Sequence, residues 1–342
     1  MRFSHRFFLY APLAACLALI GAVMVYWWFA SAAFSQALTR ANGTQILPGV
    51  TFSYTTKTLA GFPFRVDARL EGVKLTTANA RGPLSWASEH LAVHALTYNS
   101  GRIILEAAGQ QTLTWTAKDG TTHTSTFLPA LLRASANLRK GELVRFDGEA
   151  IGLSSTNHKS VGQESGVFEM TRGEFHIRHD PLHDTMDVDV HAQDIHLPKD
   201  RVYAFGNTIA KFRIDGQLGP AKPFDALFSG HADWRRTLDT WRAANGGFTL
   251  DHMDMQWGRV SATGKGTLAL DSQHRLKGQL QLMVNGVPAA PGTNTQQSIT
   301  GAVQSAAENT AHSDNGAPVI LRFNEGLIFA GSLPAGFLSP LY

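Results

Sequence analysis

The longest apolar run of the chain lies near its N-terminus, where residues 7–30 contain no charged side chain. As a helix this segment would be about 36 Å long, since a helix rises roughly 1.5 Å per residue. That length crosses a hydrocarbon core about 30 Å thick with a modest tilt. Aromatic side chains at positions 26–29 sit at the outer end, where such rings prefer the headgroup layer. The pattern predicts a transmembrane helix over 7–30, preceded by a short tail of residues 1–6.

The charges that flank this helix predict its direction. Arg2 and Arg6 precede it, and the first charged residue after it is Arg40. By the positive-inside rule the tail is cytoplasmic and residues 31–342 are translocated. Two alternatives stay open: cleavage of a signal peptide after a small-x-small exit at 30–32, and lipidation of Cys16 in a lipobox-like sequence. Both also place the remaining chain outside the cytoplasm.

Beyond the apolar run, the pattern changes to short segments that alternate apolar and polar residues, broken by Gly, Asn or Asp. Such alternation is typical of half-buried strands. The clearest examples are 91–98, 102–107, 111–118, 185–191 and a meander over 247–284. Asp119-Gly120 follows the third of these and is a strong hairpin signal, because both residues tolerate positive φ.

Two segments have helical patterns. The first is 233–245, which Asp233 can cap at its start and Gly246 can end as a left-handed residue. Its apolar side chains at i, i+4 and i+7 are Trp234, Leu238 and Trp241. The second, weaker candidate is 127–138.

Residues 286–317 lack a sustained apolar face and predict a long mobile loop. Because no series of parallel β-α-β units is apparent, the predicted fold is mainly β. It comprises the transmembrane helix, then an antiparallel, curved β-sheet domain with one or two helices.

Composition narrows the possible functions. Charged residues make up 17% of the chain, and the net charge is +3 without a basic run beyond Arg235-Arg236. A nucleic-acid-binding protein would concentrate its basic residues on one face, so no nucleic-acid partner is expected. Cys16 is the single cysteine and lies inside the apolar run, so no intrachain disulfide can form.

The most chemically suggestive stretch contains His176, His179 and His183, with aspartates between and beyond them. Zinc requires three or four such ligands that converge on one point. The spacing matches no strong zinc signature, and Asp180-Pro181 is typical of a turn that would separate the histidines. We treat the three as weak metal candidates and expect no metal or other cofactor.

No catalytic motif stands out. The sequence contains neither G-x-S-x-G nor H-E-x-x-H. The glycine-rich stretch 258–266 resembles a phosphate-binding loop only superficially, since its glycines are misplaced and Gly266 stands where Ser or Thr would hold magnesium. An enzymatic activity is therefore not expected.

The most distinctive short motif is Gly61-Phe62-Pro63-Phe64-Arg65. A glycine two residues before a proline permits a sharp change of direction, and two phenylalanines around the proline predict a compact apolar plug. The motif is thus interpreted as a structural bend before a strand that begins at Arg65.

This motif, about thirty residues after an N-terminal anchor, resembles a bacterial family of unknown function that is grouped with the AsmA-like envelope proteins. Further residues carry the same resemblance: Trp241 to Gly247, Trp257-Gly258, Gly266 to Asp271, Leu321 to Gly326, Gly331 to Pro334, and Pro340. These are glycine, proline and tryptophan positions that mark structure, and they assign no catalytic residue.

The resemblance implies a single-pass protein of the bacterial inner membrane with a periplasmic, curved β-sheet. It also implies a role in handling phospholipid or another apolar ligand in a groove of that sheet. Two other hypotheses stay open: an envelope scaffold that binds other proteins through sheet edges, and a hydrolase with an unrecognised site.

Overall fold

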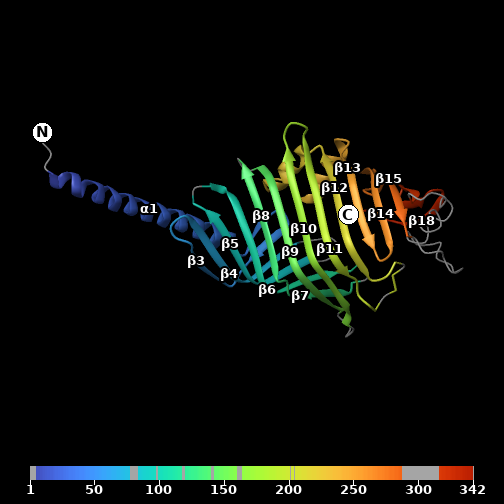
Figure 1. Ribbon diagram of the computed structural model, residues 1–342, viewed down its shortest axis with the longest axis horizontal. Coiled ribbons are helices and arrows are strands. Elements are labelled where there is room, and N and C mark those ends of the chain that lie inside the picture. The colour runs from blue at the N-terminus through green and yellow to red at the C-terminus, as the bar shows by residue number, and fades with distance from the viewer. Residues whose placement is uncertain are drawn as a thin grey trace.

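The protein is described by a computed structural model over residues 5–77, 84–97, 99–117, 120–139, 142–159, 164–200, 202–203, 205–286 and 316–341. It consists of one long helix, one 18-stranded sheet and a short helical excursion from that sheet (Figure 1). The helices are α1 His5–Ala41, η1 Lys222–Phe224, α2 Asp225–Phe228 and α3 Trp234–Ala243. The strands of the first half are β1 Thr44–Leu47, β2 Val50–Ser53, β3 Thr56–Ala60, β4 Arg65–Thr77, β5 Leu84–Leu96, β6 Asn99–Thr116, β7 Thr122–Phe127, β8 Leu131–Arg139 and β9 Glu142–Lys159. Those of the second half are β10 Glu164–Asp180, β11 Thr185–His196, β12 Thr208–Gly219, β13 Gly247–Trp257, β14 Val260–Leu270, β15 Leu276–Asn285, β16 Ala317–Asn324, β17 Leu327–Ala330 and β18 Leu333–Phe337.

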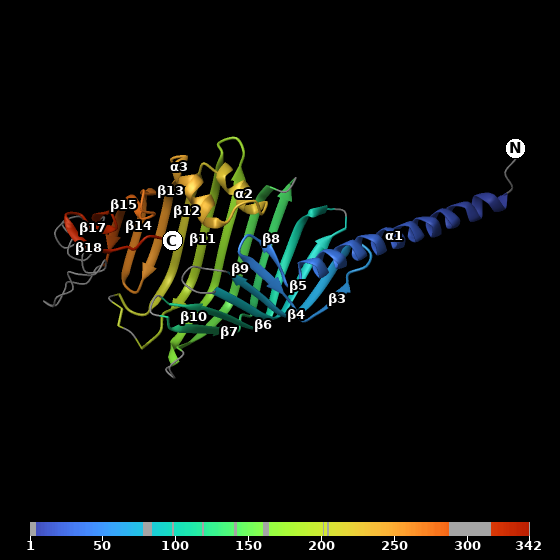
Figure 2. The same ribbon diagram turned by 180° about the vertical axis from the view of Figure 1, so that it is seen from behind.

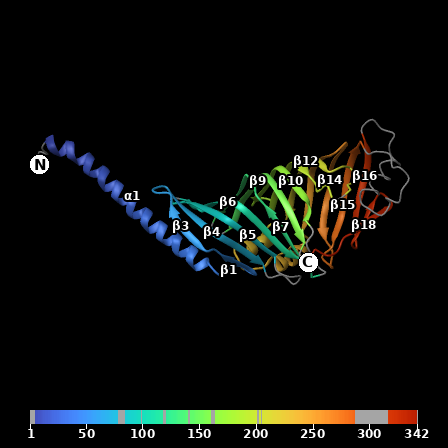
Figure 3. The same cartoon turned by 90° about the horizontal axis from the view of Figure 1, so that it is seen from below.

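The N-terminal helix α1 projects from one end of the sheet (Figures 1 and 3). Within the described residues it is the one helix long and apolar enough to cross a membrane, with a mean hydropathy of 2.1 over its most apolar window. It extends past the predicted end at residue 30, because its last turns pack on the sheet. Phe34, Leu38 and Ala41 lie against a buried apolar cluster formed by the first strands. The candidate membrane-spanning segment is thus joined to the sheet through helical turns that pack on the first strands.

The sheet is an antiparallel meander in which nearly every strand pairs with its successor. Two places depart from this order. Strands β2 and β3 both pair with β4, and β7 and β8 lie one after the other between β6 and β9, each paired with a different segment of both strands. The strands twist progressively along the sheet, which gives it a strongly curved outline (Figures 1 to 3). The predicted mainly β, antiparallel fold is confirmed.

The individual strand predictions are largely confirmed. The alternating stretch 185–191 lies in β11, and the meander 247–284 forms β13, β14 and β15. The segment 102–107 and residues 111–116 of the segment 111–118, predicted as separate strands, belong to the single strand β6, in which Gly109 has a φ of 74°. Strands β6 and β7 pair as the hairpin predicted at 119–120 requires, with Thr116 opposite Thr122, although Asp119 itself lies outside the described residues.

The helix predicted at 233–245 is α3, and the Asp233 side chain accepts a hydrogen bond from the Arg236 amide at 2.8 Å. Its end differs from the prediction, because Asn245 rather than Gly246 adopts the left-handed conformation, with a φ of 58°. The Gly246 amide then donates to the Trp241 carbonyl at 2.8 Å, which completes a Schellman-type end.

The helix predicted at 127–138 is wrong. Most of that segment is strand β8, which is hydrogen-bonded along both edges, to β6 and to β9. Two rows of inter-strand hydrogen bonds outweigh a weak local helix propensity. The mobile loop predicted at 286–317 lies outside the described residues except for its two ends, of which Ala317 already belongs to β16.

Buried apolar side chains form a cluster at each end of the sheet. The cluster near α1 consists of Phe52, Ala68, Leu70, Val73, Leu91, Val93 and Ala107. The cluster at the other end consists of Val260, Ala262, Leu282, Val284, Ala317, Val319, Leu321, Ile328, Ala330 and Ala335. The strands between these two clusters carry one apolar face and one charged face, which are described below.

Candidate functional site

A single row of apolar residues crosses the sheet from β3 to β16. Each member lies directly opposite the next on the neighbouring strand, and every member is apolar or glycine. We call this the central row: Leu59, Ala68, Val93, Leu105, Ala134, Gly148, Phe175, Val190, Ile214, Met253, Gly264, Leu282 and Val319. Because neighbouring strands are about 4.8 Å apart, the row is roughly 58 Å long when followed along the sheet.

Two flanking rows, each two residues away along the strands, have the same composition. One runs through Leu70, Leu91, Ala107, Leu132, Ala150, Gly173, Ala192, Phe212, Met255, Ala262, Val284 and Ala317. The other runs through Val66, Ala95, Ile103, Ala136, Phe146, Ile177, Val188, Gly216, Leu250, Gly266, Leu280 and Leu321. Side chains two apart on a strand share a face. The three rows therefore make one continuous apolar face.

The apolar face is buried at its two ends and open in the middle. Ala68 and Val319 are 0% and 2% exposed, since each lies in one of the two buried clusters. Between them no central-row residue from Ala134 to Met253 is fully buried, and Phe175 is 37% exposed, whereas Ala192 and Leu250 in the flanking rows are buried. Helices α2 and α3 lie over the ends of the middle strands (Figure 2), where Met186 is buried. We call the partly covered middle, from Ala134 to Met253, the open stretch.

The opposite face of the same strands carries a ladder of ion pairs. An Arg133 guanidinium nitrogen lies 2.9 Å from a Glu149 carboxylate oxygen, and Arg172 lies 2.8 Å from the other oxygen of Glu149. Arg172 also contacts Glu174 at 2.7 Å. Charged side chains that pair across strands keep this face hydrated. One face of the sheet is thus charged and wet while the other is apolar.

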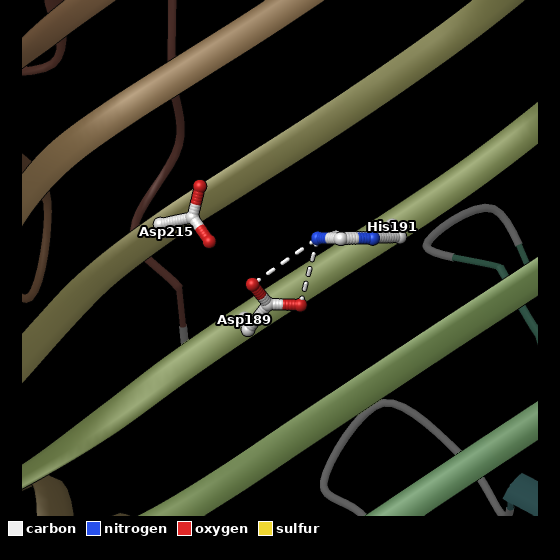
Figure 4. A group of neighbouring side chains, drawn as sticks. All are labelled: Asp189, His191 and Asp215. Atoms are coloured by element: carbon white, nitrogen blue, oxygen red, sulfur yellow. Dashed lines mark hydrogen bonds and ion pairs between the residues drawn. The ribbon is translucent and has the colours of Figure 1, made fainter.

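The densest group on the charged face is Asp189, His191 and Asp215 (Figure 4). Their ligand atoms lie within 4.8 Å of one another, and the Asp189 carboxylate is 2.9 Å from the His191 imidazole. Asp189 and Asp215 border a hollow of about 380 Å³. Three such groups can in principle hold a cation, but Arg213 already supplies positive charge, 2.7 Å from Asp215 and 3.6 Å from Asp189. The geometry is that of an ion-pair network at the surface.

The same contacts shift the pKa values of Asp215 and Asp189 in opposite directions. Hydrogen bonds from Arg213 lower the pKa of Asp215 to about 2. Burial, together with a hydrogen bond to Asp215, raises the pKa of Asp189 above its usual value. Asp215 is thus ionised throughout the physiological range, and as the pH rises it loses its proton before Asp189 does.

Arg213→Gln will make the free energy of unfolding of the protein less dependent on pH in the acid range. A carboxyl whose pKa is depressed on folding stabilises the folded state above its unfolded pKa, and that contribution is lost as the pH falls towards 2. The free energy of unfolding of the variant should therefore fall below that of the wild type above about pH 4 and converge with it near pH 2. Chemical denaturation across this range measures the difference. Arg178→Gln on the same face is the control, and an equal pH dependence in both variants would contradict the assignment.

The three histidines singled out from the sequence do not converge. His176 contacts Asp147 on the charged face at 2.8 Å, whereas His179 lies an odd number of residues further along β10 and therefore faces the other side. His183 lies in the turn after β10 and contacts Asp180 at 2.7 Å, which raises the pKa of His183. Among the described residues, these three offer no common metal position.

The tryptophans and the glycine on which the resemblance rests in the second half of the chain make structural contacts. Trp241 is 5% exposed and donates from its indole nitrogen to the Gly219 carbonyl at 3.0 Å. The Trp257 indole donates to the Gly206 carbonyl at 2.6 Å. Gly258 has a φ of 58°, and a Cβ there would lie 2.2 Å from a backbone oxygen.

The motif Gly61 to Arg65 forms the bend between β3 and β4, with Gly61 at a φ of 100°. The predicted compact plug is wrong, because Phe62 and Phe64 are 51% and 68% exposed. Arg65 begins β4 as predicted and pairs with Asp67 at 2.9 Å.

Most of the apolar face was not predicted from the alternation of apolar and polar residues in the sequence. Strands β9 and β10 contribute its middle, yet their inward positions alternate large residues such as Phe146 and Phe175 with Gly148 and Gly173. Glycines at inward positions weaken the period-two signal. The alternation is nevertheless present, and a search that counts glycine as compatible with an apolar face would find it.

Comparison with known proteins gives one match. The family described as "Uncharacterized protein conserved in bacteria (DUF2125)" matches residues 27–338, which includes every strand and the outer part of α1. No curated protein and no solved structure matches the chain.

Proposed function

The chain belongs to the bacterial family DUF2125, and we propose that this member binds a lipid or another apolar ligand along the open stretch. It acts as a single-pass protein of the inner membrane, with the tail before α1 in the cytoplasm and the sheet in the periplasm. Its role is in the cell envelope and is not enzymatic. Membrane phospholipid is the first ligand to test.

The observation that carries this proposal is the continuity of the apolar face. Three adjacent rows contain no polar side chain from β4 to β16, and the central row is only partly covered along the open stretch. Apolar surface in contact with water costs roughly 25 cal/mol per Å². Soluble proteins rarely leave a large contiguous apolar patch without a ligand or partner. Acyl chains suit such a surface because they are long, apolar and adaptable.

The proposed orientation of α1 in the membrane follows from the charges that flank it. Arg2 and Arg6 precede the apolar segment, whereas its other end has no charge before Arg40. This asymmetry favours a cytoplasmic N-terminus. The resemblance of the glycine, proline and tryptophan motifs to AsmA-like envelope proteins points to the same compartment and to lipid as the ligand class.

The charged face argues for a structural rather than a catalytic role of its carboxylates. Asp215 is held by Arg213, and Glu149 is held by both Arg133 and Arg172. A general acid or base needs a pKa near the working pH. The pKa of Asp215 is shifted away from that range, to about 2.

Site-specific photocrosslinking in bacterial cells tests the proposal on the full-length chain. Phe175 is replaced by benzoylphenylalanine, a close analogue that keeps an apolar ring in the open stretch. The matched control carries the same residue at Gln193, which is exposed on the charged face of β11. A position-specific adduct separates a ligand on the sheet from lipids that merely surround α1.

We expect a lipid adduct at position 175 and none at position 193. If position 175 yields only protein adducts, the sheet is an envelope scaffold and the lipid proposal is wrong. If position 175 yields no adduct while the variant is folded by circular dichroism, a bound ligand of either kind is excluded.

A further inference from the structure

The outer end of the membrane-spanning segment lies at the level of the first strands. From residue 7 to Trp27 the helix rises roughly 30 Å, at about 1.5 Å per residue. This distance equals the thickness of a typical hydrocarbon core. Trp27 therefore falls at the boundary between acyl chains and headgroups when residue 7 lies at the opposite boundary.

Contacts from α1 hold the bend between β3 and β4 at that same level. The Trp27 indole nitrogen donates to the Arg65 carbonyl at 2.9 Å. The Trp27 ring packs edge-on against the Phe62 ring, with 5.4 Å between centroids. The Tyr26 hydroxyl donates to the Thr97 carbonyl at 2.6 Å, on the turn that follows β5.

The sheet is fixed at this level by further contacts along α1. The Lys57 ammonium donates to the Ser35 carbonyl at 2.6 Å and to the Ser35 hydroxyl at 2.8 Å. Phe34 and Leu38 pack into the buried cluster under the first strands. Figure 3 shows the end of α1 running beside these strands. The helix thus sets the height of the first strands above the membrane.

The bend exposes large apolar side chains where the membrane surface must be. Phe62 is 51% and Phe64 is 68% exposed, although both belong to the most distinctive motif in the sequence. On the helix at the same level, Trp28 and Phe29 are 62% and 61% exposed. Aromatic rings of this kind prefer the interface between acyl chains and headgroups.

We propose that the β3–β4 bend inserts Phe62 and Phe64 into the outer headgroup layer of the bilayer that α1 crosses. The occupant of this surface is the lipid bilayer itself, because α1 contacts the bend directly and passes through the bilayer beside it. The first strands then rest on the membrane, and the apolar face begins at its surface. This position of the domain relative to the membrane does not depend on which ligand the open stretch binds.

Fluorescence quenching on the reconstituted full-length protein tests this position. Cys16 is replaced by serine, and a single cysteine is introduced by Phe64→Cys or, as the control, by Leu182→Cys. Leu182 is 88% exposed and lies in the β10–β11 turn, away from α1 (Figure 1). Each variant is labelled with a small polarity-sensitive dye in phosphatidylethanolamine–phosphatidylglycerol vesicles. Circular dichroism checks the fold of both.

Quenching by lipids that carry a nitroxide near the headgroup should be several-fold stronger for the label at position 64 than at position 182. Quenching by aqueous iodide should be several-fold weaker at position 64. Equal behaviour of the two positions would overturn the proposal. Protection of position 64 from both quenchers would also overturn it and would show that a protein surface covers the bend. Neither outcome bears on the lipid adduct at Phe175, so failure here is distinguishable from failure of the proposed function.

Discussion

Val190→Glu will lower the yield of the lipid adduct at position 175 by at least about tenfold. Val190 lies directly beside Phe175 in the central row, and Ile214 lies on its other side. A carboxylate there would face the acyl chain of a bound lipid. Charged groups placed against hydrocarbon cost on the order of 2–3 kcal/mol even where they can partly reach water. A loss of 1.4 kcal/mol already corresponds to a tenfold change in affinity.

The control for this variant is Gln193→Glu on the same strand. Gln193 lies on the charged face opposite Lys211, so the new carboxylate meets a favourable partner and water. Its lipid adduct at position 175 should match that of the parent protein. Both variants should keep the wild-type circular dichroism spectrum, because Val190 is only partly buried. A folded Val190→Glu variant with an undiminished adduct would show that the lipid bypasses the central row.

The long apolar helix and the β class of the domain could be predicted because their signals are local. An uncharged stretch over 7–30 is long enough to span a bilayer whatever follows it. The alternation over 185–191 and the cap of Asp233 on α3 likewise depend only on neighbouring residues. The extension of α1 to Ala41 could not be predicted in this way, because it depends on packing against β-strands distant in the sequence.

The apolar face is harder to predict because it is created by pairing. Phe175 joins the central row only because β9 and β11 place Gly148 and Val190 opposite it. A shift of one residue in either register would bring a charged residue into the row. Register depends on turns and bulges along the whole meander, so no single window of sequence contains it. Once strand boundaries and registers are known, the sequence alone gives the composition of every row.

The incorrect prediction of a helix at 127–138 also results from strand pairing that the local sequence does not contain. Its alternating pattern is weak, with Leu131 and Leu132 adjacent and alanines around Arg133. Local propensity therefore favours neither structure strongly. In the folded protein, β8 is paired on both edges, and this decides the outcome. The exposed Phe62 and Phe64 illustrate the reverse case, in which an apolar pattern predicts burial in the protein but the side chains point out of it.

Gly246→Ala will destabilise the helical excursion that follows β12. A methyl group at position 246 would lie 2.3 Å from the ring of Trp241, a distance that no real contact allows. The ring cannot move away easily, because it is buried, donates to the Gly219 carbonyl and packs against Phe224. Overpacking of this kind costs about 1–3 kcal/mol. The melting temperature, followed by near-ultraviolet circular dichroism of the tryptophans, should fall by several degrees.

The adjacent substitution Gly247→Ala isolates this steric effect. Its methyl group would lie 3.4 Å from the Leu268 carbonyl oxygen, which is an ordinary contact, and Gly247 needs no left-handed backbone. Both variants lose the same glycine flexibility in the unfolded chain, so their difference reports the contact with Trp241. The Gly247 variant should melt within about a degree or two of the wild type. Equal melting temperatures for the two variants would mean that Trp241 leaves its site readily, and that the end of α3 is not fixed by this tryptophan.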